Sequence, residues 1–162
     1  MEKLDVRTEK IIEDFLAKAE KFLEEAKAIS NGYIPQFSLV VRKAHDSVEL
    51  ALKVLFLIVG GDYPKPKNHN IGQFLTKEFL DTKLKDFPPY LIWEKIPHIR
   101  LISTTLAKWK DLAMYGDEEI NAASNQIFGR EEANFSIKGA EEIINSIRSF
   151  YYHYRYKVSG GS

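Results

Sequence analysis

The strongest constraint on the fold is a predicted helix, residues 35–59, whose character changes along its length. Its first half carries a stripe of charged side chains, whereas its second half ends in the apolar run VLFLIV at residues 54–59. A helix that is apolar all round must be buried on every side. Gly60 and Gly61 then stop it. We therefore expect this helix to form the centre of a helical bundle.

Other stretches carry apolar residues at intervals of three or four, the spacing of a helix with one buried face. We expect a first helix over residues 4–29, a third beginning near residue 70 with Asn68 or Asn70 as its N-cap, a fourth over 88–115, and a last helix over 137–158 with Ser136 as its N-cap. Pro97 lies inside the fourth pattern, so a kink or a break is expected there. A short extra helix is expected over 117–127, before Gly129.

The expected fold class is all-α: an up-and-down antiparallel bundle of four main helices plus one or two short helices. No stretch alternates apolar and polar residues for long, so no sheet is expected. The length of 162 residues suits one domain, which we place at residues 1–158. The closing Ser-Gly-Gly-Ser of residues 159–162 resembles a flexible linker added for expression.

Composition and charge exclude several classes of protein. Apolar residues make up 44% and charged residues 28%, as in soluble globular proteins. The longest apolar run is too short to span a bilayer, and the N-terminus lacks the apolar core of a signal peptide, so a cytoplasmic location is expected. The absence of cysteine excludes disulfides and Cys–zinc sites. Lys plus Arg and Asp plus Glu both total 23, which argues against a broad basic surface for nucleic acid but not against a local basic patch.

The order of several short motifs resembles that of the HEPN family, small all-α domains linked to nucleotides and RNA. The motifs are KAEKFLEEAKAI at 18–29, Asn31-Gly32-Tyr33, VELALK at 48–53, His69-Asn70-Ile71, Met114-Tyr115-Gly116-Asp117, and Ser136 with Ala140. The resemblance covers residues 5–157. Many relatives carry Arg where this chain has Met114, so a phosphate contact from that position is not expected here.

The resemblance implies an accessory or toxin-like protein, of the kind found in toxin–antitoxin pairs. It would bind nucleotide or RNA and act with a separately encoded minimal nucleotidyltransferase. A homodimer through the last helix and its tyrosines is expected, and no cofactor. A protein-interaction module without nucleotide chemistry is one alternative.

A second alternative is a metal-independent endoribonuclease. Ribonucleases of the family use an Arg followed by four to six residues and a His, because His can move a proton while Arg holds the phosphate. Arg148 and His153 form such a pair, with four residues between them, and would act across the dimer. Five helical steps, however, separate the two side chains by about 140°. The competing interpretation makes Arg148 a solvated surface residue and His153 a residue at the edge of a packed seam.

The segment around this pair mixes aromatic and cationic residues. Residues 148–157 contain four Tyr, one Phe, three cations, one His and no acid. Such a mixture suits stacking on bases and contact with phosphates. We assign this nucleotide- or RNA-binding role to Tyr151, Tyr154, Arg155 and Lys157. Tyrosines at this spacing equally suit a core or a dimer interface, and the resemblance implies that Tyr154 or Tyr156 could be modified by the nucleotidyltransferase.

The charged stripe of the central helix is the other candidate site. It consists of Arg42, His45, Asp46, Glu49 and Lys53, in which Arg42–Asp46 and Glu49–Lys53 are i,i+4 pairs. Asp46 and Glu49, with His45 or His69, could in principle hold a divalent metal. Helical sites of that kind draw ligands from several helices, and only one supplies them visibly here. We therefore predict a salt-bridge ladder and no metal site.

Overall fold

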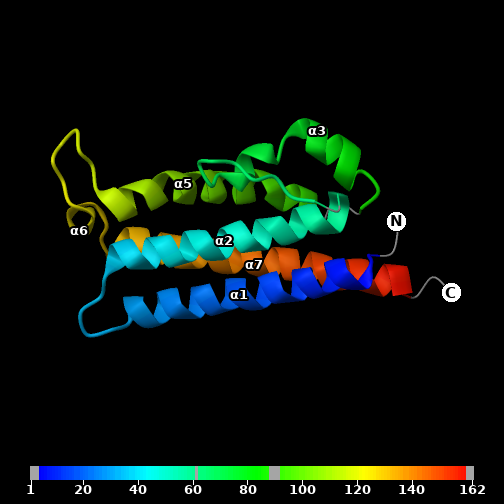
Figure 1. The fold of residues 1–162 in the computed structure, drawn as a ribbon, viewed down its shortest axis with the longest axis horizontal. Helices are drawn as coiled ribbons and strands as arrows, with labels where there is room; N and C mark the ends of the chain where they lie inside the picture. The colour runs from blue at the N-terminus through cyan, green and yellow to red at the C-terminus, as the bar shows by residue number, and fades with distance from the viewer. Residues whose placement is uncertain (1–3, 61, 88–91, 160–162) are drawn as a thin grey trace.

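Four long helices run antiparallel, up and down, along one axis (Figure 1). The computed structural model describes residues 4–60, 62–87 and 92–159. The long helices are α1 (Val6–Ser30), α2 (Phe37–Gly60), α5 (Ile96–Tyr115) and α7 (Arg130–Ser159). The all-α bundle predicted from the sequence is confirmed. The described residues contain no strand, only an isolated antiparallel bridge between Asp117 and Ala122.

The central position of α2 is confirmed. Each residue from Val54 to Ile58 is at most 6% exposed. The helix packs against α1, α5 and α7, and the Ser47 hydroxyl donates to the Ala19 carbonyl oxygen of α1 at 2.8 Å. Among the described residues, no helix is both long and apolar enough to cross a membrane.

The single third helix predicted from about residue 70 is wrong. The chain instead forms a 3₁₀ turn, η1 (Ile71–Phe74), then one turn of α3 (Lys77–Phe79) that continues as a π turn, η2 (Leu80–Leu84). Leu75 leaves the helical conformation, and the Thr76 hydroxyl caps the new start by accepting from the Phe79 N–H. The Asn70 side chain caps nothing. Within η1, the backbone of Gly72 lies directly on Ser103 of α5.

The fourth helix is shorter than predicted at its start. A 3₁₀ turn, η3 (Trp93–Lys95), leads into α5, and Pro97 occupies the first turn of α5. Proline is tolerated there because the first N–H groups of a helix have no partner within it. The break expected at Pro97 is therefore the helix start. The remainder of the prediction, residues 88–91, lies outside the described residues.

The last helix begins seven positions earlier than predicted, at Arg130 instead of 137. Ser136 is not its N-cap, because its hydroxyl is buried and donates to the Glu132 carbonyl oxygen at 2.7 Å. The Glu132 carboxylate instead accepts from the Gly129 N–H at 2.9 Å, which satisfies the helix start.

The extra helix predicted over 117–127 is reduced to α6 (Ser124–Ile127), because the chain turns back between Asp117 and Ala122. Of the predicted tail, Ser159 belongs to α7 and residues 160–162 lie outside the described residues.

Candidate functional site

Three of the residues singled out in the sequence gather in one surface pocket between α1 and α7. This α1–α7 pocket has a volume of about 250 Å³. Its polar lining comes from Glu13 and Glu20 of α1 and from Arg148, Tyr151, Tyr152 and Arg155 of α7. The four α7 residues stand at i, i+3, i+4 and i+7, so they share one face of the helix.

Carboxylates from α1 hold the two guanidinium groups of the α1–α7 pocket. Arg148 Nη2 lies 2.9 Å from Glu20 Oε1, and Arg155 Nη1 lies 3.0 Å from Glu13 Oε1. Both arginines are partly exposed. Arg148 Nε is buried and has no hydrogen-bond partner among the described residues. The pocket therefore presents two positioned guanidinium groups, one of which has an unused donor.

Tyr151 forms the floor of this pocket. Only 1% of it is exposed, and its hydroxyl lies 3.5 Å from Glu13 Oε1. Burial raises the pKa of Tyr151 to about 12, although the Arg155 charge acts in the opposite direction. The phenol therefore stays protonated at neutral pH and can donate a hydrogen bond there.

The predicted stacking of bases on Tyr151 and Tyr154 does not fit the structure. Tyr154 is 5% exposed, and its ring stacks on Phe87 at a centroid distance of 6.0 Å. Of the two alternatives that the regular spacing suggested, a core or a dimer interface, the core holds for both rings. The exposed tyrosines of this segment are Tyr152 and Tyr156, at 59% and 80%, and Lys157 is exposed beside them.

Arg148 and His153 lie on different sides of α7. Arg148 faces α1 through Glu20. His153 stands one turn beyond Ser149, which lines a groove of about 460 Å³ between α5 and α7. Its Nε2 atom is buried and has no partner among the described residues. The structure thus does not bring the pair together within one chain, and their catalytic role stays a prediction.

The charged stripe of α2 is part of a larger group, the α2 cluster: His45, Asp46, Glu49, Lys53, His69 and Lys110. The Glu49–Lys53 pair is confirmed, at 2.8 Å. Asp46 pairs not with Arg42 but with Lys110 Nζ of α5, at 3.4 Å. The loop after α2 folds back and places His69 Nδ1 3.2 Å from Glu49 Oε2. His69 adopts a left-handed backbone conformation, with φ 56°.

Both carboxyl groups of the α2 cluster are held in their charged form. Burial alone would raise the pKa of Asp46, but the His45 hydrogen bond and the Lys110 charge outweigh it, so this pKa lies below its usual value. Burial likewise opposes the ionisation of Glu49, yet the hydrogen bond and charge of Lys53 lower its pKa. The two carboxylates of the cluster are therefore ionised at neutral pH.

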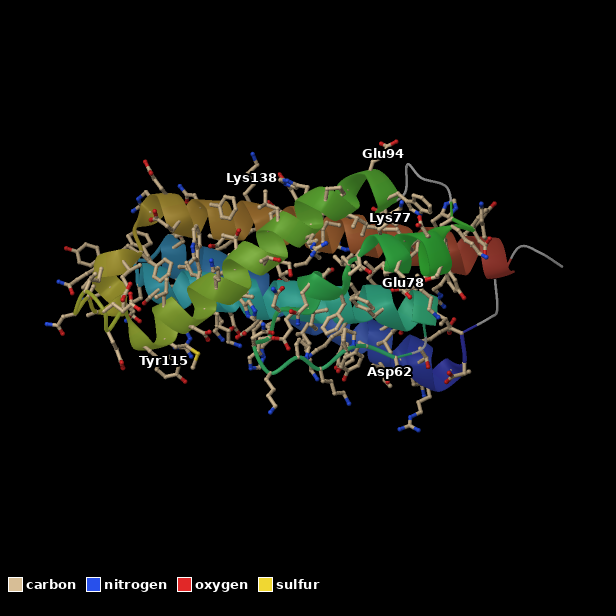
Figure 2. All side chains as sticks on the ribbon, turned by 90° about the horizontal axis from the view of Figure 1, so that it is seen from above. Asp62, Lys77, Glu78, Glu94, Tyr115 and Lys138 are labelled. Atoms are coloured by element: carbon tan, nitrogen blue, oxygen red, sulfur yellow. The ribbon has the colours of Figure 1, made fainter. Side chains whose placement is uncertain are left out.

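Sequence reasoning missed one pair, His98 and Glu142. His98 Nε2 lies 3.0 Å from Glu142 Oε2, in the groove between α5 and α7. In Figure 2, Glu94 and Lys138 both project from the upper side of the bundle. No local pattern pointed to the pair, because 44 positions separate its members.

The described residues define an all-α bundle of four long helices. Its polar side chains gather at the α1–α7 pocket, at the α2 cluster and in the groove of His98 and Glu142. A family model described as the HEPN domain matches residues 12–150. The protein belongs to the HEPN family, which supports a role connected with nucleotides or RNA. No curated protein and no solved structure matched the chain.

Proposed function

We propose that this protein is a toxin-like HEPN accessory protein that binds nucleotide or RNA and works with a separately encoded minimal nucleotidyltransferase. The observation that carries the proposal is the gathering of Arg148, Arg155 and Tyr152 at the α1–α7 pocket. Guanidinium groups suit phosphate oxygens, and an exposed aromatic ring suits a base.

A phosphate would bind by exchanging with the carboxylates that now hold the arginines. Glu20 and Glu13 keep the guanidinium groups extended toward the pocket, and both pairs are partly exposed. Exposed ion pairs contribute little free energy, so replacing each carboxylate by a phosphate costs little. These two carboxylates and Glu9, whose Oε1 lies 3.9 Å from Arg155 Nε, also offset the arginine charges. We therefore expect modest affinity that falls with salt.

The dimensions of the pocket favour the binding of one phosphate and its sugar. Its volume of about 250 Å³ is below the roughly 300–1,000 Å³ of pockets that enclose a whole ligand. The base would therefore lie outside, against the exposed ring of Tyr152. Tyr151, with its pKa of about 12, stays protonated at neutral pH and would supply a hydrogen-bond donor to the ligand.

Exposed apolar residues support the existence of a protein partner. Tyr33 and Ile34 lie in the α1–α2 turn. Tyr115 ends α5 and Ile120 lies in the segment that follows, at the same end of the bundle (Figures 1 and 2). Large apolar side chains on a surface are typical of interaction sites. We assign this end to the nucleotidyltransferase.

The homodimer expected from the sequence also belongs to this proposal. Tyr151 and Tyr154 are occupied in the core of the chain itself. A dimer through α7 would therefore use the exposed ring of Tyr156 and leave Tyr152 free for the base.

The test is a titration of the purified protein with fluorescently labelled single-stranded RNA, ATP and GTP at two salt concentrations. We expect Arg148→Ala and Arg155→Ala each to weaken binding about tenfold, the size of one lost hydrogen bond to a charged group. Each should also reduce the salt slope of RNA binding by about 0.7. Arg130→Ala, an exposed arginine at the other end of α7, is the matched control. Equal binding by all variants would refute this site.

A further inference from the structure

We propose that the α2 cluster binds a divalent transition metal such as Zn²⁺ through His45, Asp46, Glu49 and His69. The site is separate from the α1–α7 pocket, so it does not depend on the proposed nucleotide-binding function.

Three ligands are already close together on α2. One ligand atom each from His45, Asp46 and Glu49 lie within 4.8 Å of one another. His45 Nδ1 is 3.4 Å from Asp46 Oδ1, and His69 Nδ1 is 3.2 Å from Glu49 Oε2. Four ligands at about 2.1 Å in a tetrahedron are separated by about 3.4 Å. Two edges of such a tetrahedron therefore already exist, and small side-chain rotations would complete it.

The fourth ligand comes from a second element of the fold. In the sequence, only one helix supplied ligands visibly, which argued against a metal. The loop after α2 removes that objection, because it carries His69 back over the cluster. The imidazole rings of His45 and His69 stand 6.4 Å apart, edge to face, at 83°. Two imidazoles and two carboxylates form a ligand set that zinc accepts.

The two lysines of the cluster do not occupy all the carboxylate oxygens. Lys53 binds Glu49 Oε1, whereas His69 contacts Glu49 Oε2. Lys110 and His45 both contact Asp46 Oδ1. A carboxylate that binds a metal through one oxygen is commonly held by a hydrogen-bond donor on the other. Lys53 is placed to serve as such a donor for Glu49. Lys110 contacts the same Asp46 oxygen as His45, so a metal bound to that oxygen would displace Lys110 from it.

Burial divides the cluster into an inner and an outer part. His45 is 2% exposed and Glu49 15%, so these ligands are shielded from water. Asp46 and His69 are more open, at 38% and 51%, and they give an ion access from solvent. A metal would thus bind at the mouth of the cluster and fasten the loop that carries His69 to α2.

The test uses full-length protein without a histidine tag, stripped of metal with EDTA and titrated with Zn²⁺ by calorimetry. Co²⁺ replaces Zn²⁺ in a parallel absorbance titration, because its visible spectrum reports tetrahedral coordination. We expect one ion per chain and an increased thermal midpoint with Zn²⁺. His69→Ala should weaken binding about 10- to 100-fold while leaving the helical circular dichroism unchanged.

His98→Ala is the matched control. His98 is also exposed, at 59%, and also pairs with one glutamate, Glu142 at 3.0 Å, but it lies outside the cluster. It should bind Zn²⁺ as the wild type does. Absence of binding by the wild type, or equal binding by His69→Ala, would refute the proposal. Glu49→Gln provides a second check, since it removes a carboxylate ligand and nearly preserves the volume of the side chain.

Discussion

Gly139 of α7 lies directly against Ile102 of α5, so closely that a Cβ atom on Gly139 would stand 2.7 Å from Ile102 Cγ2. This contact brings α5 and α7 together beside the groove that holds His98 and Glu142. A glycine inside a helix is unfavourable in itself. Its value here is the close approach that it permits between two helices.

Gly139→Ala should therefore destabilise the protein, although alanine favours helices by about 1 kcal/mol over glycine. We expect overpacking against Ile102 to exceed that gain, with a net loss of about 1–2 kcal/mol. The measurement is urea unfolding followed by circular dichroism. Gly60→Ala is the control, because no atom of the described residues lies within 4 Å of the added methyl group. An unchanged midpoint for Gly139→Ala would contradict the close packing.

The hydroxyl of Tyr151 should titrate later than those of the exposed tyrosines. Its pKa is about 12 in the folded protein, compared with its usual 10.0, because the group is buried. The folded chain thus holds this proton more tightly than the unfolded chain. The resulting stability is complete below pH 10 and is lost as the pH rises toward 12. Ultraviolet absorbance of tyrosinate should show a late step that Tyr151→Phe removes; its survival in that variant would contradict the assignment.

Trp93 connects η3 to the end of η2. Its indole Nε1–H donates to the Leu84 carbonyl oxygen at 2.8 Å. Trp93→Phe keeps an aromatic ring but removes this bond, and we expect a loss of about 0.5–1.5 kcal/mol. Urea unfolding measures it. If the Leu84 carbonyl oxygen finds no other donor in Trp93→Phe, we expect a loss of unfolding free energy at the upper end of this range. An unchanged free energy of unfolding would contradict a stabilising role for this hydrogen bond.

Purified protein should not cleave single-stranded RNA in the absence of metal. Within one chain, Arg148 faces α1 while His153 lies on another side of α7. An acid–base residue and a phosphate-binding residue must reach the same phosphate. Gel analysis of labelled RNA tests this, with His153→Ala beside the wild type. Cleavage by the wild type alone would revive the ribonuclease interpretation and require that a second chain complete the site.

Which helices form could be predicted because it depends on local periodicity. The apolar spacing of α1 predicted a helix with one buried face, and the all-apolar end of α2 predicted the helix at the centre of the bundle. The same reasoning failed where tertiary packing overrides local pattern. Gly72 on Ser103 accompanies a break at Leu75, and only the N-cap residue Thr76 gave a local sign of that break. Ser136 looked like an N-cap, although Glu132 already satisfies the helix start.

The sequence by itself determined the fold class, the central helix and the family, because these follow from the order and spacing of residues along the chain. The tertiary structure decided which side chains meet. His69 reaches Glu49 across 20 positions and His98 reaches Glu142 across 44, and Arg148 is turned toward Glu20 and away from His153. Such encounters depend on loop paths and on the rotation of each helix about its axis. Periodicity fixes the buried face of a helix but not the neighbour against which that face packs.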